Sequence, residues 1–200
     1  MKDKVYILNI KNMHIEYKTL LNELPMYCLH KIDNGCNEKL KKERTIAWYM
    51  LYKLLLVYHN VDLTKCNIYE NKNGKPYIND IFFNITHSKD YIGIMISQQE
   101  CGIDIEKIEL KVNKERFAKK ILNDIEYQEF LKDNSSDFLI QKWTKIETYY
   151  KIKGEGLSFS NIKLNSVDKD IYTVKLDDEY YLSYGPNECD IVDILELNIL

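Results

Sequence analysis

Apolar residues follow two different spacings along the chain, and each spacing predicts a different element. Residues 4–10 form a short apolar, β-branched run, which is typical of a strand. Within residues 37–60 the apolar positions recur every three or four residues, which indicates one buried helix face: Ala47, Met50, Leu51, Leu54, Leu55 and Tyr58. We expect Asn37 to cap the N-terminus of this long helix.

The middle of the chain predicts turns and strands. Asn73-Gly74-Lys75-Pro76 is a turn signal. Two apolar runs follow it, at residues 81–88 and 91–97, and they predict a hairpin-like pair. The chain then turns again, and residues 102–110 predict a further strand.

The C-terminal part predicts two helices followed by strands. Residues 113–132 are amphipathic, and a second helix is expected to start after a Ser135 cap and to end at Gly154 and Gly156. Three later runs alternate like strands: YTVKL, YYLSY and ILELNIL. The element order, β-α-β-β and then β-α-α-β-β, predicts an α+β fold of two halves that meet near residue 100.

Composition narrows the class of protein. With 200 residues, 45% of them hydrophobic, the chain can form one full domain or two small ones. A net charge of -3 gives no global field for nucleic acid, so any anion site must be local. The five cysteines, at 28, 36, 66, 101 and 189, lack C-x-x-C spacing, which favours a reducing cytoplasm over disulfides or zinc. The apolar run at the N-terminus is too short for a signal peptide. No apolar run in the chain approaches the ~18 residues of a membrane span.

The run GIDIE carries the first candidate chemistry. In a strand, Asp104 and Glu106 lie on one face and their Cα atoms are about 6–7 Å apart. Two carboxylates at that separation can converge on a hard cation such as Mg²⁺. The alternative is a half-exposed strand with a solvated acidic face.

The run WTKIETYYK carries the second group of candidate catalytic residues. Glu147 and Lys151 are spaced i, i+4, so they form either a surface ion pair or two groups facing a cleft. In a cleft, Glu147 could be a third metal ligand or a general base, and Lys151 an anion clamp.

Further polar residues are individually ambiguous. His87 is either structural or a phosphate donor helped by the hydroxyls of Thr86 and Ser88. Lys75 is either an exposed loop lysine or a group placed by a rigid turn. Arg44 either snorkels from the helix stripe or points into a site beside the core.

In chain order these residues form a distinctive series: an arginine near a helix start, G-K-P, N-I-T-H-S, G-I-D-I-E and W-x-x-x-E-x-x-x-K. The series resembles the 4'-phosphopantetheinyl transferase superfamily, in its longer, two-halved, surfactin-synthetase-activating type. The resemblance runs from Arg44 to Leu157. The segments before and after it carry no motif that we can place.

The resemblance implies two similar α/β halves packed with pseudo-twofold symmetry, with the active site in the cleft between them. Residues 1–100 would contact the coenzyme A nucleotide, and residues 101–200 would carry the metal site and the catalytic helix. Members of the family transfer the 4'-phosphopantetheine arm of coenzyme A to a serine of an apo acyl or peptidyl carrier protein. They use Mg²⁺, with Mn²⁺ as an alternative, and release adenosine 3',5'-bisphosphate. The implied protein is a cytoplasmic monomer without nucleic-acid or membrane partners.

Roles carry over by position. Asp104, Glu106 and Glu147 would hold the metal against the pyrophosphate. Glu147, directly or through water, would deprotonate the carrier serine, with Lys151 as the second catalytic group. The residues implied to contact the phosphates or line the nucleotide site are Arg44, Lys75, Thr86, His87, Ser88 and Lys151.

One position departs from the family pattern, W-x-x-K-E-[AS]-x-x-K. Ile146 stands where the lysine is expected, and Lys145 lies one residue earlier, which is a rotation of about 100° on a helix. We hypothesise that Lys151 covers the lost charge together with Lys145 or Lys153.

Three other interpretations stay open: a degenerate homologue that binds coenzyme A or a carrier without transfer, a small Mg²⁺-dependent phosphohydrolase, and a purely structural α+β protein. A basic run could dock an acidic carrier or be a solvated helix face: Lys111, Lys114, Arg116, Lys119 and Lys120.

Overall fold

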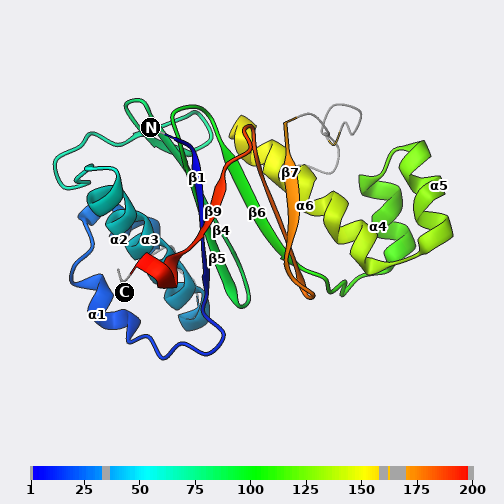
Figure 1. Ribbon diagram of the computed structural model, residues 1–200, viewed down its shortest axis with the longest axis horizontal. Helices are drawn as coiled ribbons and strands as arrows, with labels where there is room; N and C mark the ends of the chain where they lie inside the picture. Colours follow the sequence, from blue (N-terminus) through cyan, green and yellow to red (C-terminus); the bar gives the residue numbers. More distant parts are fainter. Residues whose placement is uncertain (1, 33–36, 158–161, 163–169, 198–200) are drawn as a thin grey trace.

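Two sheets lie side by side in the middle of the protein, and helices cover their outer faces (Figure 1). The computed structural model describes residues 2–32, 37–157, 162 and 170–197. The larger sheet has the order β2-β3-β4-β5-β1-β9 and the smaller sheet has the order β6-β8-β7. The strands are β1 (Lys4–Asn9), β2 (Tyr69–Glu70), β3 (Pro76–Ile78), β4 (Ile81–Ser88), β5 (Tyr91–Ser97), β6 (Gly102–Lys107), β7 (Tyr172–Asp177), β8 (Tyr180–Gly185) and β9 (Asp190–Asp193).

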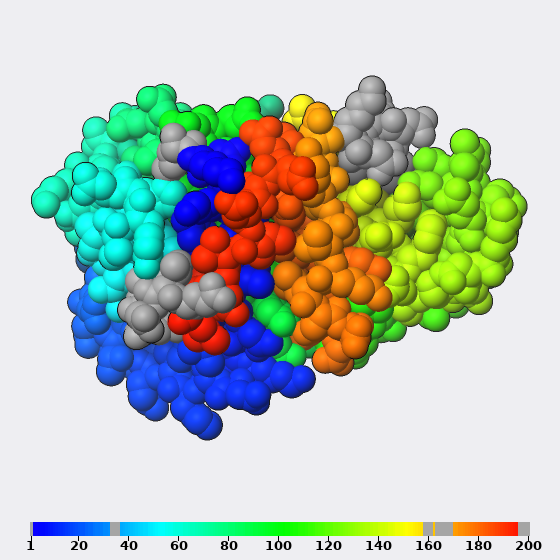
Figure 2. Space-filling model, viewed as in Figure 1, coloured from blue at the N-terminus to red at the C-terminus, as the bar shows by residue number. Residues whose placement is uncertain are grey.

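The helices group at the two ends of the molecule (Figures 1 and 2). Helix α3 (Glu38–Tyr58) packs on the larger sheet, and α1 (Tyr17–Leu21) and α2 (Met26–Ile32) pack on α3. Helix α6 (Ser136–Lys153) packs on the smaller sheet, and α4 (Lys114–Ile121) and α5 (Asp124–Asp133) pack on α6. The 3₁₀ helix η2 (Ile194–Leu197) follows β9. None of the described helices is long and apolar enough to cross a membrane.

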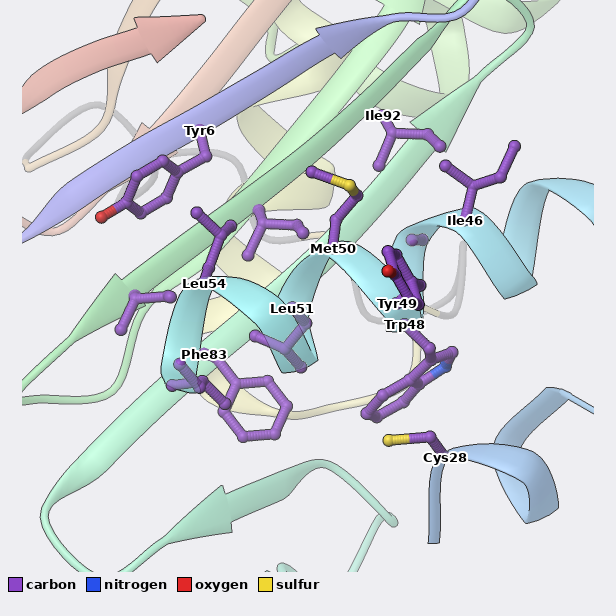
Figure 3. Packing of buried hydrophobic residues seen from close by; sticks show 14 of the residues in the cluster. Tyr6, Cys28, Ile46, Trp48, Tyr49, Met50, Leu51, Leu54, Phe83 and Ile92 are labelled. Carbon is purple, nitrogen blue, oxygen red and sulfur yellow. The ribbon is translucent and has the colours of Figure 1, made fainter. Parts of the chain in front are cut away.

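The long helix α3 forms because its sequence supplies both a cap and a buried stripe. The Asn37 side chain accepts a hydrogen bond from the Leu40 N–H, as predicted. Met50, Leu51 and Leu54 are fully buried, and they pack with Phe83 of β4 and Ile92 of β5 (Figure 3). This contact fixes α3 on the outer face of the larger sheet.

The helix α6 is bounded as the sequence predicts. Ser135 accepts a hydrogen bond from the Phe138 N–H, and Gly154 ends the helix in the left-handed conformation, with φ 61°. The helix packs on β6 and β8, and its Thr148 hydroxyl donates to the Ser183 carbonyl at 3.1 Å. The residues of α6 are therefore held against β6.

The strands β4 and β6 bring the two sheets together. The Asn84 Oδ1 atom accepts from the Ile103 N–H at 3.0 Å, so a side chain replaces a backbone partner between the sheets. The sheets also approach closely at Gly93 of β5, where an added Cβ atom would lie 2.8 Å from the side chain of Ile105 of β6, so the position favours glycine. Ile103 and Ile105 belong to the buried cluster between the sheets.

Three strands of the larger sheet lie in the order β4-β5-β1, and the strands of the smaller sheet lie in the order β7-β8-β6, with antiparallel neighbours in both. Near the C-terminus, β9 pairs in parallel with β1 of the larger sheet. Figure 2 shows this C-terminal segment lying against the N-terminal strand.

Three sequence predictions of the fold were wrong or incomplete. The single helix at 113–132 is two helices, because Asn123 forms a capping box with Glu126 that starts α5. The run at 194–200 is not a strand where it is described, since residues 194–197 form a 3₁₀ helix and 198–200 lie outside the described residues. The short helices α1 and α2 were not predicted.

Candidate active site

The strand β6 presents two carboxylates on one face, as its alternation predicts. Asp104 is only 3% exposed, and Glu106 is half-buried two residues later. Their neighbours Ile103 and Ile105 turn the other way into the core between the sheets. Neither carboxylate is therefore on a solvated acidic face.

The helix α6 adds a carboxylate and an ammonium. The Lys151 Nζ atom lies 2.6 Å from Asp104 Oδ1 and 3.3 Å from Thr86 Oγ1. Glu147, one turn earlier, is half-buried on the same helix. The ammonium of Lys151 therefore pairs with a buried aspartate of another element, and the expected simple surface pair with Glu147 does not describe its main contact.

Burial and neighbouring carboxylates raise the pKa values of Glu106 and Glu147. Burial, followed by the charges of Asp104 and Glu147, raises the pKa of Glu106 to about 7. Burial, followed by the charge of Asp104, also raises the pKa of Glu147, and Lys151 partly opposes this. Carboxylates with such raised pKa values are found at sites that bind a cation or transfer a proton, and also in structural clusters.

The strand β4 divides its polar residues between two faces. The Thr86 hydroxyl donates to Asp104 Oδ1 at 3.3 Å and the Ser88 hydroxyl to Glu106 Oε2 at 3.5 Å. His87 faces α3 instead, where its Nδ1 atom lies 3.6 Å from Glu43 Oε2. Burial lowers the pKa of His87, while Glu43 works in the opposite direction.

A hollow of about 290 Å³ lies on the His87 side of β4. Arg44 and His87 line it, together with Lys31, Ala47, Trp48, Gly74, Pro76 and Ile85. Arg44 thus points into a cavity rather than snorkelling along the surface. Sequence reasoning missed Lys31, Trp48 and Glu43, because their partners come from distant elements; the position of Glu43 beside Arg44 was the only available signal.

Lys75 is not exposed, contrary to one of the two interpretations of its turn. Its side chain is 10% exposed, and its Nζ atom contacts Glu100 Oε2 at 2.8 Å. The same atom donates to the carbonyls of Cys101 at 2.8 Å and Lys151 at 2.9 Å. The ammonium therefore points at the end of α6, away from the hollow, and its phosphate contact stays a prediction.

The carboxylates of β6 and α6 are candidate ligands for a hard divalent cation, as the resemblance implies. Among the side chains that the structure describes, only Asp104 Oδ2 is a buried polar atom without a hydrogen-bond partner. Carboxylate oxygens are the ligands that Mg²⁺ prefers. The described side chains do not include three or more His, Cys, Asp or Glu residues already gathered in metal geometry. The fit therefore rests on the unpartnered oxygen and on the mutual repulsion of the three acids.

The pKa of Glu106 makes stability depend on pH. Its folded pKa of about 7 lies above the ordinary 4.5. The folded protein then holds a proton that the unfolded chain releases, so the free energy of unfolding should fall as pH rises between these values, by up to about 3 kcal/mol. Urea unfolding in EDTA should show this fall, and Glu106→Gln should flatten it.

The control for this experiment is Glu129→Gln, since Glu129 is exposed on α5. It should keep the wild-type slope. Adding Mg²⁺ at about pH 8 should stabilise the wild type more than Glu106→Gln. An unchanged slope in Glu106→Gln would contradict the buried, repelled state of this carboxyl.

Comparison with known proteins relates the same region to one family. Residues 100–188, which include β6 and α6, match the 4'-phosphopantetheinyl transferase superfamily (ACPS). A 4'-phosphopantetheinyl transferase of Bacillus subtilis is 32% identical over 116 residues, and Sfp of B. subtilis strain 168 is 36% identical over 91. The transferase gsp of Aneurinibacillus migulanus is 30% identical over 113 residues.

Residues 100–188 are thus similar to the 4'-phosphopantetheinyl transferase superfamily. The aligned stretches cover 55%, 42% and 54% of this chain, in the same order of relatives. They cover only 47%, 40% and 46% of the relatives, so the chain spans less than half the length of the curated proteins it matches.

The departure from the family pattern at Ile146 has a structural explanation. Ile146 is 3% exposed and belongs to the buried cluster with Ala118, Ile121 and Phe130 of α4 and α5. The position therefore faces the neighbouring helices. Lys153 lies over the Tyr149 ring at 5.7 Å.

Trp143 begins the run WTKIETYYK on α6 and contacts residues of two other elements. It hydrogen-bonds Glu106, which lowers the pKa of that carboxyl against the effect of burial. Its ring also meets Phe117 of α4 edge-on, with centroids 5.3 Å apart. The family tryptophan thus holds a carboxylate of the candidate site.

Proposed function

We propose that the protein transfers the 4'-phosphopantetheine arm of coenzyme A to a serine of an apo acyl or peptidyl carrier protein and releases adenosine 3',5'-bisphosphate. The observation that carries the proposal is the contact between Lys151 of α6 and buried Asp104 of β6, beside Glu106 and Glu147. This cluster lies within the segment that matches the superfamily.

The proposed metal ligands are Asp104, Glu106 and Glu147. A bound Mg²⁺ would neutralise charge on the pyrophosphate and on the leaving phosphate. Lys151 would bind the same phosphates as a point charge, helped by the Thr86 and Ser88 hydroxyls. Arg44 and His87, which line the hollow on the other face of β4, would bind another phosphate of the nucleotide.

Glu147 is the proposed base. Its raised pKa makes it a stronger proton acceptor than an ordinary glutamate, so it can take the proton of the carrier serine near neutral pH. The serine oxygen then forms a bond to the phosphorus that carries the pantetheine arm. The bond from that phosphorus to adenosine 3',5'-bisphosphate breaks, and the leaving group takes the electron pair.

The proposal also includes the organisation inferred from the resemblance. Residues 1–100 would contact the nucleotide and residues 101–200 would carry the metal ligands, with pseudo-twofold symmetry between the halves. The repeated strand order supports this symmetry. The protein would act as a cytoplasmic monomer, and the free thiols of the described cysteines agree with a reducing compartment: Cys28, Cys66, Cys101 and Cys189.

The test is to incubate the protein with coenzyme A, Mg²⁺ and a panel of apo carriers, and to weigh the carriers. We expect a metal-dependent mass gain of one phosphopantetheine and none with Asp104→Asn. Tight coenzyme A binding without transfer would identify a degenerate homologue. Release of phosphate or nucleotide without a carrier would identify a phosphohydrolase. Either result would overturn the proposal.

The basic run on α4 is the proposed carrier site. A hollow of about 500 Å³ is lined by Val112, Asn113, Arg116, Phe117 and Lys120, so it combines apolar walls with cations. Carrier helices are expected to be acidic. Arg116 and Lys120 are the cations that line the hollow, and Lys119 of the same helix pairs with Glu115 at 2.7 Å.

Exchanging Lys119 and Lys120 for glutamate should raise the KM for the carrier by about tenfold, because like charges would repel the partner. The KM for coenzyme A should not change. The control is Lys18→Glu on α1, at the opposite end of the molecule (Figure 1). Steady-state kinetics at low salt measure both constants, and unchanged carrier kinetics would exclude this surface.

A further inference from the structure

The turn at 71–75 packs against the C-terminal end of α6. The Asn73 amide donates to the Gly154 carbonyl at 2.6 Å. A Cβ atom at Gly154 would lie 2.2 Å from Asn71 Nδ2, so the turn approaches the helix end as closely as only a glycine allows. These contacts join residues of the two halves that are far apart in the sequence.

Lys75 is the centre of this contact. Its Nζ atom is within 2.9 Å of the Lys151 carbonyl and within 3.3 Å of the Ile152 carbonyl, both in the last turn of α6. It also contacts Glu100 and the Cys101 carbonyl, just before β6 begins. Four oxygens thus surround an ammonium that has three protons to donate.

The contacts have two physical consequences. The last carbonyls of a helix have no partner within the helix, and a cation there is favoured by the helix dipole. Because the same ammonium binds the start of β6 and the end of α6, it fixes the spacing of the two elements. These elements carry Asp104 and Lys151, whose side chains meet at 2.6 Å.

We propose that Lys75 is a positioning residue, which clamps the end of α6 to the start of β6 and so sets the geometry of Lys151 against Asp104. It acts without touching substrate, since its donors are already engaged by protein oxygens and it lies outside the wall of the Arg44–His87 hollow. The inference rests on the proposed transfer for its kinetic part. It replaces the phosphate contact that the resemblance implies for this lysine.

The test compares Lys75→Met with Lys72→Met, which removes an exposed lysine from the same turn. We expect Lys75→Met to lower kcat by about tenfold or more, since small misplacements of reacting groups cost this much. The dissociation constant of adenosine 3',5'-bisphosphate should stay within about twofold of wild type. Lys72→Met should leave both unchanged.

A second readout does not depend on activity. Amide hydrogen exchange in the last turn of α6, residues 150–154, should be faster in Lys75→Met than in wild type. Asn73→Ala removes an uncharged contact to the same helix end and should give a smaller increase of the same kind. If Lys75→Met fails to fold, Asn73→Ala replaces it as the test variant for hydrogen exchange.

The possible outcomes test the positioning role of Lys75 separately from the proposed transfer. Nucleotide binding weakened tenfold with an unchanged kcat would assign Lys75 to a phosphate and overturn the inference. Unchanged exchange and unchanged kcat would overturn it too. If the wild type transfers nothing to any carrier, the proposed function fails, and hydrogen exchange alone decides whether the clamp exists.

Discussion

Glu147→Gln should lower kcat of the proposed transfer by about 10²–10⁴-fold, because an amide of the same shape cannot accept the proton of the carrier serine. The residue is half-buried on α6, and its raised pKa comes from burial and from the charge of Asp104. The glutamine keeps the side-chain volume, so packing should survive. Single-turnover mass spectrometry of the carrier measures the loss.

The stability of the same variant distinguishes a lost base from a lost fold. Removing one of three mutually repelling carboxylates should leave the unfolding temperature unchanged or raise it. The control Glu129→Gln, on the exposed face of α5, should retain full activity. If Glu147→Gln keeps more than about a tenth of the wild-type rate, Glu147 is not the base.

Ile146→Lys should destabilise the protein by about 2–4 kcal/mol, because it places a charge in an apolar cluster. Ile146 is 3% exposed and shares its cluster with Ala118, Ile121, Leu122 and Phe130. Thermal unfolding should show a midpoint about 10 °C lower. Although this exchange introduces the lysine of the family pattern, we do not expect it to raise transfer activity.

Ile146→Met is the matched control, since it conserves volume and should cost less than about 1.5 kcal/mol. Wild-type stability together with tighter coenzyme A binding in Ile146→Lys would mean that this position reaches the cleft. That result would contradict the assignment of Ile146 to the helix packing.

The sequence predicted those elements in which local signals agree. Asn37 and Ser135 cap their helices as expected, and Gly154 ends α6 in the left-handed conformation. The break between α4 and α5 was missed because an amphipathic pattern continues across it, although Asn123 and Glu126 already spell a capping box. The pairing of β9 with β1 could not be predicted, since the local sequence of a strand does not determine which other strand it pairs with.

By itself, the sequence predicted that Asp104 and Glu106 share one face of β6 and that Glu147 and Lys151 share one face of α6, because alternation and helical spacing decide which side chains share a face. The family resemblance came from the order of the motifs. Only the tertiary structure decided what each face meets. It paired Lys151 with Asp104, packed Ile146 against α4 and α5 and placed Lys75 at the end of α6. The physical reason is that a side chain's role depends on atoms from distant segments, and these come together only when the two sheets pack.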